Sequence, residues 1–196
     1  MSEQTIVRRG MALTDFLERS AEKRFELIDG EVYEISPSVL AHSILIRELL
    51  FALSAVARME DQWEVFSETT FIAPEQSASN WVEDSLVPDV VMFDKAALSA
   101  LRADKSLVAS RPAALIPALV AEVLSPTDRQ SVVARKVQRY LALGVRLIWI
   151  IDPQVEQVTV YRHGSNQATL LNAADTLTAD DLLPNFQLAL NAFFAL

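Results

Sequence analysis

Three residues combine types and spacing that could hydrolyse a phosphodiester with a hard metal ion. Asp89 follows a proline in the apolar stretch LVPDVVMF, Glu122 interrupts the apolar stretch LVAEVL, and Lys136 lies in the segment after it. Mg²⁺ prefers oxygen ligands and keeps several waters, so two carboxylates and a backbone carbonyl are enough to hold it. The ion polarises the phosphate and lowers the pKa of a bound water. A nearby ammonium can orient that water or stabilise charge on the phosphoryl group.

Each of these residues also has an ordinary structural interpretation. Asp89 could cap a backbone group at the solvent-exposed end of a strand, and Lys136 could be a surface lysine whose stem lies along apolar neighbours. Glu122 could belong to a buried ion pair with an arginine. An unpaired, ionised Glu inside an apolar strand is strongly unfavourable, so a cation, a protonation shift or exposure at the strand end must compensate it.

The predicted elements around these residues bring them toward one sheet. Apolar stretches predict strands at Leu86–Asp94 and Leu119–Leu124, and a Ser-Pro pair ends the second strand. The pattern Thr127-x-x-Gln130 predicts a capping box at the start of a helix, and Gly144 is a plausible end for that helix.

The position of Lys136 on this helix determines where its ammonium can point. The helix carries one apolar stripe, formed by Val133, Val137, Tyr140 and Leu141. Lys136 lies beside the stripe, stacked between Val132 and Tyr140. Its ammonium could therefore point along the helix flank toward the sheet.

The remaining stretches predict a mixed α/β or α+β fold, with a sheet packed by helices. The pair Asp29-Gly30 in RFELIDGEVYEIS is a strong hairpin turn. The other predictions are, in chain order, a short helix near Thr14–Ala21, a long buried helix from about Val39 to Met59, a strand at Trp63–Ala73, a loop over ASNWVEDS, a segment with helical character at 95–112, the strand RLIWIID and its hairpin partner QVTVYRH. The tail at 175–196 mixes strand and helix signals and allows no assignment.

The composition suits one globular domain over residues 1–196 with a sizeable core. The chain is 51% hydrophobic and has 4 Gly and no Cys. The lack of Cys excludes disulfides and thiolate metal sites, and it fits a reducing cytoplasm. The N-terminus lacks the apolar core of a signal peptide, and the longest apolar run, Leu49–Ala57, is too short to span a bilayer. We therefore expect a cytoplasmic protein without membrane contact.

The charge of the chain bears on nucleic-acid binding. A net charge of −9 argues against broad, nonspecific adhesion to nucleic acid. A local cationic strip points the other way, and it contains Arg129, Arg135, Lys136, Arg139 and Arg146. This strip could face a phosphate backbone, or it could be an ordinary solvated face that balances acidic neighbours. A basic partner subunit or the groove of a homodimer could also supply positive charge.

Four blocks of the sequence together resemble a known family. FELIDGEVYEISPS…H, VPDVVMF, LVAEVLSPTDR…RKVQRYLALGV and LIWIIDP are similar, in this order, to the small endonucleases of the Uma type in the PD-(D/E)XK nuclease superfamily. The resemblance covers about Phe25 to Tyr161. It implies a restriction-endonuclease-like fold, a mixed central sheet flanked by helices with an added N-terminal β-hairpin. It also implies that Asp89 and Glu122 bind the metal, which we expect to be Mg²⁺ with Mn²⁺ able to substitute.

The sequence departs from the superfamily pattern at one position. Leu124 stands two residues after the acid, where the superfamily motif has a lysine, and Leu cannot do the work of an ammonium. Uma-type members characteristically show EVLS at this place, with a lysine on the next helix, and Lys136 fits that relocated position. The resemblance therefore implies that Asp89, Glu122 and Lys136 form the catalytic set.

Two further residues could support this site. His42 lies at the start of the long helix and could act behind the metal ligands or as a general base. A half-buried His with satisfied hydrogen bonds is the alternative. Glu31 follows the hairpin turn and could approach the metal, or it could be a cross-strand surface charge like Glu26, Asp29 and Glu48.

Three functional hypotheses follow. The first is a metal-dependent DNA endonuclease that uses Asp89, Glu122 and Lys136. The second is a catalytically inert protein of the same fold that binds DNA or a protein partner, which Leu124 and the acidic balance favour. The third is an unrelated mixed α/β protein in which Glu122 is merely ion-paired. A metal titration separates the third hypothesis from the others, and a nicking assay on supercoiled DNA separates the first from the second.

Overall fold

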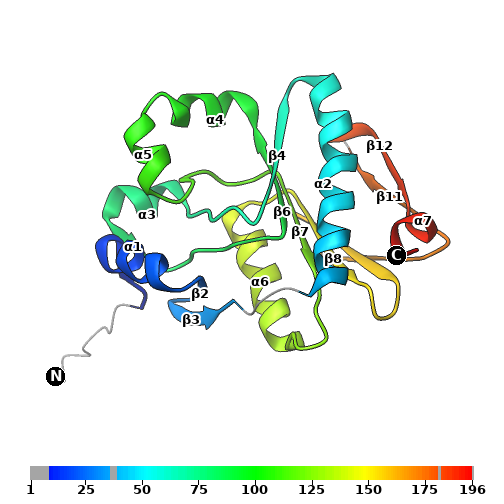
Figure 1. The fold of residues 1–196 in the computed structure, drawn as a ribbon, viewed down its shortest axis with the longest axis horizontal. Helices are drawn as coiled ribbons and strands as arrows, with labels where there is room; N and C mark the ends of the chain where they lie inside the picture. Colours follow the sequence, from blue (N-terminus) through cyan, green and yellow to red (C-terminus); the bar gives the residue numbers. More distant parts are fainter. Residues whose placement is uncertain (1–8, 36–38, 181, 196) are drawn as a thin grey trace.

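A computed structural model describes residues 9–35, 39–180 and 182–195. Its centre is a six-stranded sheet with the strand order β10-β9-β8-β7-β6-β4 (Figure 1). The strands are β4 (Trp63–Ser67), β6 (Val90–Asp94), β7 (Leu119–Val123), β8 (Leu147–Asp152), β9 (Gln157–Arg162) and β10 (Thr169–Asn172). Strands β7 and β8 run parallel, and the other neighbouring pairs run antiparallel. This mixed sheet confirms the predicted fold class.

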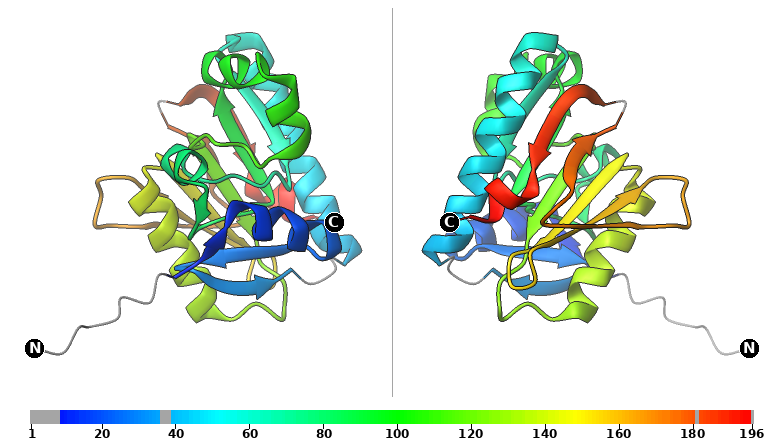
Figure 2. Two further views of the ribbon diagram at one scale, coloured as in Figure 1. Left: turned by 90° about the vertical axis from the view of Figure 1, so that its left-hand side faces the viewer. Right: turned by 90° about the vertical axis from the view of Figure 1, so that its right-hand side faces the viewer.

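Different helices cover the two faces of the sheet. The long helix α2 (Leu40–Glu60) packs on one face, and α6 (Gln130–Leu143) packs on the other (Figures 1 and 2). Successive side chains of a strand point to opposite faces, and β6 shows this directly. Val90 belongs to the core on the α2 side, whereas Val91 belongs to the core on the α6 side.

Helix α6 connects the parallel strands β7 and β8. It ends as predicted at Gly144, which has a φ of 90° and donates its N–H to the carbonyl of Leu141. The capping-box prediction was wrong, because the helix begins after Arg129 and has no side-chain cap. The preceding turn is closed by Asp128 instead, whose carboxylate accepts the Ser125 N–H at 2.7 Å.

The predicted hairpin is present and lies against a distant part of the chain. Strands β2 (Phe25–Ile28) and β3 (Glu31–Glu34) pair across the Asp29-Gly30 turn (Figure 2). Leu27 and Ser85 exchange two backbone hydrogen bonds of 2.9 Å, which fixes β2 beside the segment that leads to Asp89. Gly30 is required at the turn, because a Cβ there would lie 2.4 Å from the Gly10 nitrogen.

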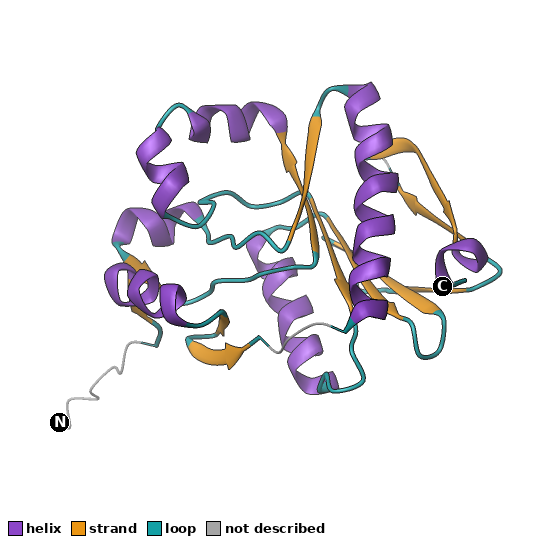
Figure 3. Ribbon diagram, in the orientation of Figure 1, coloured by secondary structure: helices purple, strands orange, loops and turns teal. Residues whose placement is uncertain are grey.

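Several short elements differ from the sequence-based expectation. Strand β4 ends at Ser67 and does not reach Ala73, because Glu68 takes a left-handed conformation with a φ of 48°. The stretch ASNWVEDS, expected to be a loop, contains the end of one helix and a short strand (Figure 3). The other short elements outside the main sheet in the first 110 residues are β1 (Met11–Ala12), α1 (Leu13–Glu22), α3 (Pro74–Ser79), β5 (Trp81–Val82), α4 (Lys95–Arg102) and α5 (Lys105–Ser110).

The C-terminal tail forms another two-stranded sheet, on the α2 side. It consists of β11 (Thr176–Ala179), β12 (Leu183–Ala189) and the short helix α7 (Leu190–Phe194). Phe186 stacks on Trp149 of β8 with 5.6 Å between ring centroids, which ties the tail to the main sheet.

Helix α2 is long and apolar enough, by length and composition, to cross a membrane. The expectation from sequence considered only the uninterrupted run at Leu49–Ala57, which is much shorter than the helix. In the fold, Leu45, Leu49 and Leu53 are fully buried in the core that α2 shares with the sheet and the tail. The expectation of a buried helix therefore holds for one face of α2 only, because Leu40, Phe51 and Met59 elsewhere on the helix are exposed.

Candidate active site

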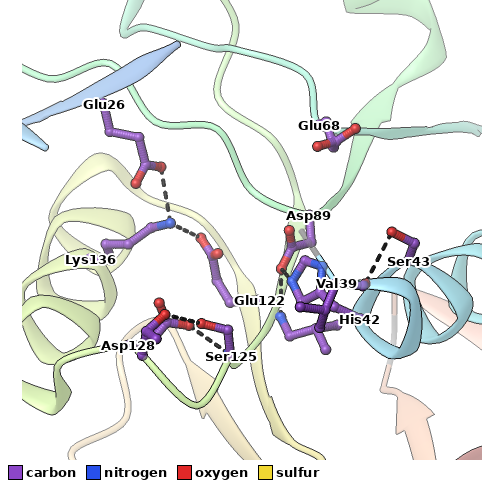
Figure 4. Close-up of polar contacts among 12 residues, drawn as sticks. Glu26, Val39, His42, Ser43, Glu68, Asp89, Glu122, Ser125, Asp128 and Lys136 are labelled. Carbon is purple, nitrogen blue, oxygen red and sulfur yellow. Dashed lines mark hydrogen bonds and ion pairs between the residues drawn. The ribbon is translucent and has the colours of Figure 1, made fainter. Parts of the chain in front are cut away.

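Asp89 and Glu122 lie next to each other where two central strands meet their loops (Figure 4). Strands β6 and β7 are antiparallel, with Val90 opposite Ala121. Extending this register by one residue places Asp89 opposite Glu122. The Val123 N–H donates to Asp89 Oδ2 at 2.7 Å, which holds this carboxylate against β7. The two predicted metal ligands therefore come together on neighbouring strands.

Glu122 is buried, and its surroundings determine its protonation. Its side chain points to the α6 side of the sheet, and Oε1 accepts hydrogen bonds from Lys136 and Tyr140. The pKa of Glu122 is raised to about 8, chiefly because burial disfavours the ionised carboxylate. The Lys136 ammonium opposes this shift, and the nearby Asp89 and Glu26 contribute to it. Both a cation, Lys136, and a shift in protonation therefore compensate the buried Glu122. Both contacts are made to Oε1, so Oε2 is the oxygen that a cation shared with Asp89 could take.

Lys136 reaches the sheet as its place on the helix predicts. Its Nζ lies 2.7 Å from Glu122 Oε1 and 3.0 Å from Glu26 Oε1. Burial lowers the pKa of Lys136, but the carboxylates of Glu122 and Glu26 outweigh burial and raise the pKa above its ordinary value. The ammonium therefore stays charged next to the two acids of the site. Lys136 is not the snorkelling surface lysine of the alternative interpretation.

The sequence reasoning missed the role of Glu26, which it grouped with surface charges. Glu26 lies on β2 and is only 7% exposed. Its Oε1 accepts the Val87 N–H at 2.8 Å in addition to the Lys136 ammonium. A signal was present, because Glu26 stands between the apolar residues Phe25 and Leu27, much as Glu122 stands inside an apolar strand. The partner could not be inferred, since it comes from a helix more than a hundred residues away.

His42 contacts the other acid of the pair. Its Nε2 lies 3.3 Å from Asp89 Oδ2, and both side chains are mostly buried. The hydrogen bond to Asp89 raises the pKa of His42, while burial opposes this shift. His42 Nδ1 is buried and has no hydrogen-bond partner within the described residues. His42 therefore holds Asp89 from the α2 side, as a residue behind the metal ligands would.

Glu31 does not join this cluster. Its carboxylate accepts hydrogen bonds from Arg135 and Tyr33 on the exposed face of the hairpin, at 2.8 and 2.9 Å. The Arg135 hydrogen bond lowers the pKa of Glu31. Glu31 matches the alternative interpretation of a surface charge.

The arginines of the cationic strip partly pair with acids of the hairpin and of the segment that follows β5. Arg135 pairs with Glu31, and Arg139 pairs with Asp84 and with Asp29, the latter at 3.4 Å. These two arginines balance acidic neighbours, which is the alternative that the sequence left open for the strip. Their availability to a phosphate backbone is correspondingly reduced.

A cavity of about 570 Å³ lies away from these residues. It is lined by apolar side chains that include Phe66, Phe93 and Leu98. Asp89, Glu122 and Lys136 do not line it. The charged cluster, and not this cavity, is therefore the candidate site.

A comparison with known protein families shows the family to which this chain is related. The sequence model of the Uma2 family, described as "Putative restriction endonuclease", matches residues 13–191. The chain belongs to the Uma2 family. The match spans all the residues of the site, from Glu26 to Tyr140. A comparison with curated proteins gives no match.

The fold of this Uma2 protein also has a solved counterpart. A crystal structure described as a putative nuclease belonging to DUF820, from Anabaena variabilis ATCC 29413, superimposes with a TM-score of 0.77. The two chains are 22% identical, and the similarity covers 94% of this chain and 97% of the other. At this identity, the likeness shows that the two proteins share a fold.

The donor set of this Uma2 protein fits a hard divalent cation that keeps waters. No group of three or more His, Cys, Asp or Glu side chains in the described ranges is arranged to hold a metal. The site offers two adjacent carboxylates, and each has one oxygen outside the contacts made to Oδ2 of Asp89 and Oε1 of Glu122. Mg²⁺ is typically held by one or two carboxylates, waters and substrate phosphate oxygens. The pair is therefore suited to Mg²⁺ and unsuited to a closed, all-protein metal site.

Proposed function

We propose that this chain is a metal-dependent DNA endonuclease with Asp89 and Glu122 as metal ligands and Lys136 as the catalytic ammonium. One observation carries the proposal. The Lys136 Nζ lies 2.7 Å from Glu122 Oε1, and Asp89 stands opposite Glu122 on the neighbouring strand. Three elements thus bring two acids and one ammonium to the same end of the sheet, and the family to which the chain belongs is described as "Putative restriction endonuclease".

The residues of the chain have distinct tasks in this proposal. A bound Mg²⁺ would polarise the phosphate and lower the pKa of a bound water. Lys136 would donate a hydrogen bond to that water or to a phosphoryl oxygen, and so stabilise developing negative charge. Tyr140 holds Glu122, and His42 holds Asp89, so the acids are oriented before substrate arrives.

In this proposal, Lys136 replaces the lysine of the superfamily motif, whose position is taken by Leu124 in this chain. The task needs an ammonium at one place in space, and the sequence position that supplies it is secondary. Leu124 belongs to the apolar neighbours of the α6-side core. Lys136 enters the same region from α6 and contacts the acid that Leu124 follows by two residues.

A second candidate function is an inert nuclease-fold protein that binds DNA or a protein partner. The net charge of −9 favours it, and so do the ion pairs that engage Arg135 and Arg139. In this case, the Lys136 contacts would serve stability alone. The endonuclease candidate cleaves DNA, and the inert candidate does not.

Two measurements separate the candidates. Mg²⁺ or Mn²⁺ titrated into the metal-free protein should raise the melting temperature, because a ligand of the folded state stabilises it by mass action. Supercoiled plasmid should be nicked with Mg²⁺ and left intact with EDTA, and Glu122→Gln should be inactive. Glu34→Gln is the matched control, since Glu34 pairs with the exposed Lys23 on the same hairpin that carries Glu26. Metal binding without nicking would support the inert candidate. If the protein shows neither metal binding nor nicking, both functional candidates fail and only the fold of the family remains.

A further inference from the structure

The Lys136 ammonium is held by two carboxylates that come from unrelated parts of the chain. Glu122 belongs to β7 in the central sheet, and Glu26 belongs to β2 in the added hairpin. The distances from Nζ are 2.7 and 3.0 Å, and all three side chains are at most 12% exposed. Figure 4 shows Lys136 lying between the two acids. The hairpin is therefore part of the immediate surroundings of the candidate active site.

Glu26 itself is held rigidly. Its Oε1 accepts the Val87 N–H at 2.8 Å, two residues before Asp89. The backbone of β2 is fixed beside this segment by the paired hydrogen bonds between Leu27 and Ser85 and by the Gly30 N–H, which donates to the Glu83 carbonyl at 2.8 Å. The carboxylate of Glu26 therefore has a defined position relative to both Lys136 and the Asp89 segment.

Glu122 alone would hold Lys136 less strongly in a site that contains the metal. In the proposed function, Glu122 shares a divalent cation with Asp89, and a carboxylate that is bound to a cation attracts an ammonium less strongly. The cation also repels the ammonium. A second carboxylate on the far side of Nζ removes this difficulty, because it offsets the repulsion and keeps a hydrogen-bond acceptor in place.

We propose that Glu26 is a positioning residue that keeps the Lys136 ammonium at its working place when Glu122 binds the metal. The proposal rests on the proposed function and assigns to the N-terminal hairpin a direct part in it. Without the Glu26 charge, Glu122 becomes the only carboxylate on Lys136. The lysine then competes with the metal for Glu122, and its ammonium is misplaced for turnover when the metal wins.

The test variant is Glu26→Gln, which retains a carbonyl oxygen for the Val87 N–H and removes the charge. Glu34→Gln is the control, because Glu34 lies on the same hairpin and pairs with the exposed Lys23. The chain has lysines only at positions 23, 95, 105 and 136, so NMR of lysine-labelled protein can resolve the Lys136 ammonium. In the wild type, its protons should exchange slowly with water. In Glu26→Gln they should exchange faster, and in Glu34→Gln they should be unchanged.

The second readout is metal affinity, measured by calorimetry with Mn²⁺ alone. Glu26→Gln should weaken Mn²⁺ binding on the order of 10-fold, because outer partners of metal ligands typically have effects of this size. Its nicking activity should fall by about 10- to 100-fold in kcat with little change in KM, since the ammonium and not DNA binding is affected. Glu26→Asp, which keeps the charge, should be closer to wild type than Glu26→Gln.

The outcomes separate this proposal from the proposed function. Unchanged Lys136 exchange together with unchanged Mn²⁺ affinity in a folded Glu26→Gln variant would overturn the positioning role, even if the wild type cleaves DNA. A wild type that neither binds Mn²⁺ nor cleaves DNA would overturn the proposed function. In that case, faster Lys136 exchange in Glu26→Gln would still support the hold on the ammonium, and unchanged exchange would overturn it.

Discussion

Helix α6 carries two basic residues, one turn apart, that each contact buried acids, and the two contacts differ in kind. Arg139 pairs with Asp84, which is 2% exposed, and the other Asp84 oxygen accepts the Asp29 N–H at 2.9 Å. Both oxygens of Asp84 are thus used. Lys136 pairs with Glu122 at Oε1, the oxygen that Tyr140 also contacts, and Asp89 stands opposite.

This contrast distinguishes a structural buried acid from one that is a candidate for chemistry. A buried acid whose oxygens are both satisfied by the protein, such as Asp84, is a structural clamp. A buried acid that keeps one oxygen beside a second acid has the capacity to bind a cation. The Arg139 contact therefore joins the hairpin to α6, and the Lys136 contact prepares a site. Mutations of the two residues should separate these roles.

The largest expected effect is on cleavage. Lys136→Ala should lower the rate of plasmid nicking per folded molecule by about 100- to 1,000-fold, the size seen when a donor to developing negative charge is removed. Lys136→Arg should also be impaired, because a planar guanidinium does not replace a compact ammonium that acts on one water. Arg139→Ala should retain the wild-type rate per folded molecule. Equal losses of nicking rate in Lys136→Ala and Arg139→Ala would contradict the different roles of the two residues.

The next effect is on stability. Arg139→Ala should destabilise the fold by about 3 kcal/mol, because it leaves Asp84 buried without its cation. Urea denaturation of the wild type and the variant measures this change. The double variant Asp84→Asn/Arg139→Ala should recover part of the loss, since the unpaired charge is gone. If Arg139→Ala is as stable as the wild type, another group must compensate the buried charge of Asp84.

The response to divalent metal should distinguish Asp89, a proposed metal ligand, from a structural acid such as Asp84. Asp89→Asn should keep an acceptor for the Val123 N–H and leave the metal-free melting temperature unchanged or raised, because it removes charge beside Glu122. It should lose most of the metal-induced stabilisation, which for a wild-type site at about 100 times Kd is about 2.7 kcal/mol. Strong destabilisation with an intact metal response would mark Asp89 as a structural cap.

Taken per pH unit, the smallest effect is the pH dependence of the metal-free protein. The folded-state pKa of Glu122, about 8, lies above its ordinary value, so the folded state binds this proton more tightly than the unfolded state does. The contribution to stability is fully present below about pH 4.5 and is lost as the pH rises toward 8. The raised pKa of His42 acts in the same direction. Stability should therefore fall between pH 5 and 8, by at most about 1.4 kcal/mol per pH unit for one proton.

Chemical denaturation across this pH range, without divalent metal, measures the slope. Glu122→Gln should flatten it, because the titrating group is absent. Arg139→Ala should leave the slope near that of the wild type, although the whole curve lies lower. A slope that is unchanged in Glu122→Gln would show that Glu122 is not the group responsible.

Most of the fold followed from local sequence patterns. The hairpin turn at Asp29-Gly30, the long helix α2, the end of α6 at Gly144 and the β8–β9 hairpin were predicted, because each depends on nearby residues. The capping box failed, since Asp128 closes the turn that Thr127 was expected to cap. The tail could not be assigned because its short strands are fixed by packing on α2 and β8.

The site was predictable in part. Asp89, Glu122 and Lys136 stood out because each breaks or borders an apolar pattern, and the structure brings all three together. Glu26 shares that signal, but its importance depends on how β2 docks beside residues 83–87, which no local pattern specifies. Arg139 illustrates the reverse case, since its position in a basic strip left both DNA contact and the balancing of acidic neighbours open, and the structure pairs it with Asp84.

A crystal structure of the protein soaked in Mn²⁺ would show whether Asp89 and Glu122 share a divalent cation beside Lys136. The anomalous signal of the metal should place it between the Asp89 and Glu122 carboxylates, with Lys136 still in contact with Glu26. A Mn²⁺ peak at another place, or none at a concentration that saturates the thermal shift, would contradict the account.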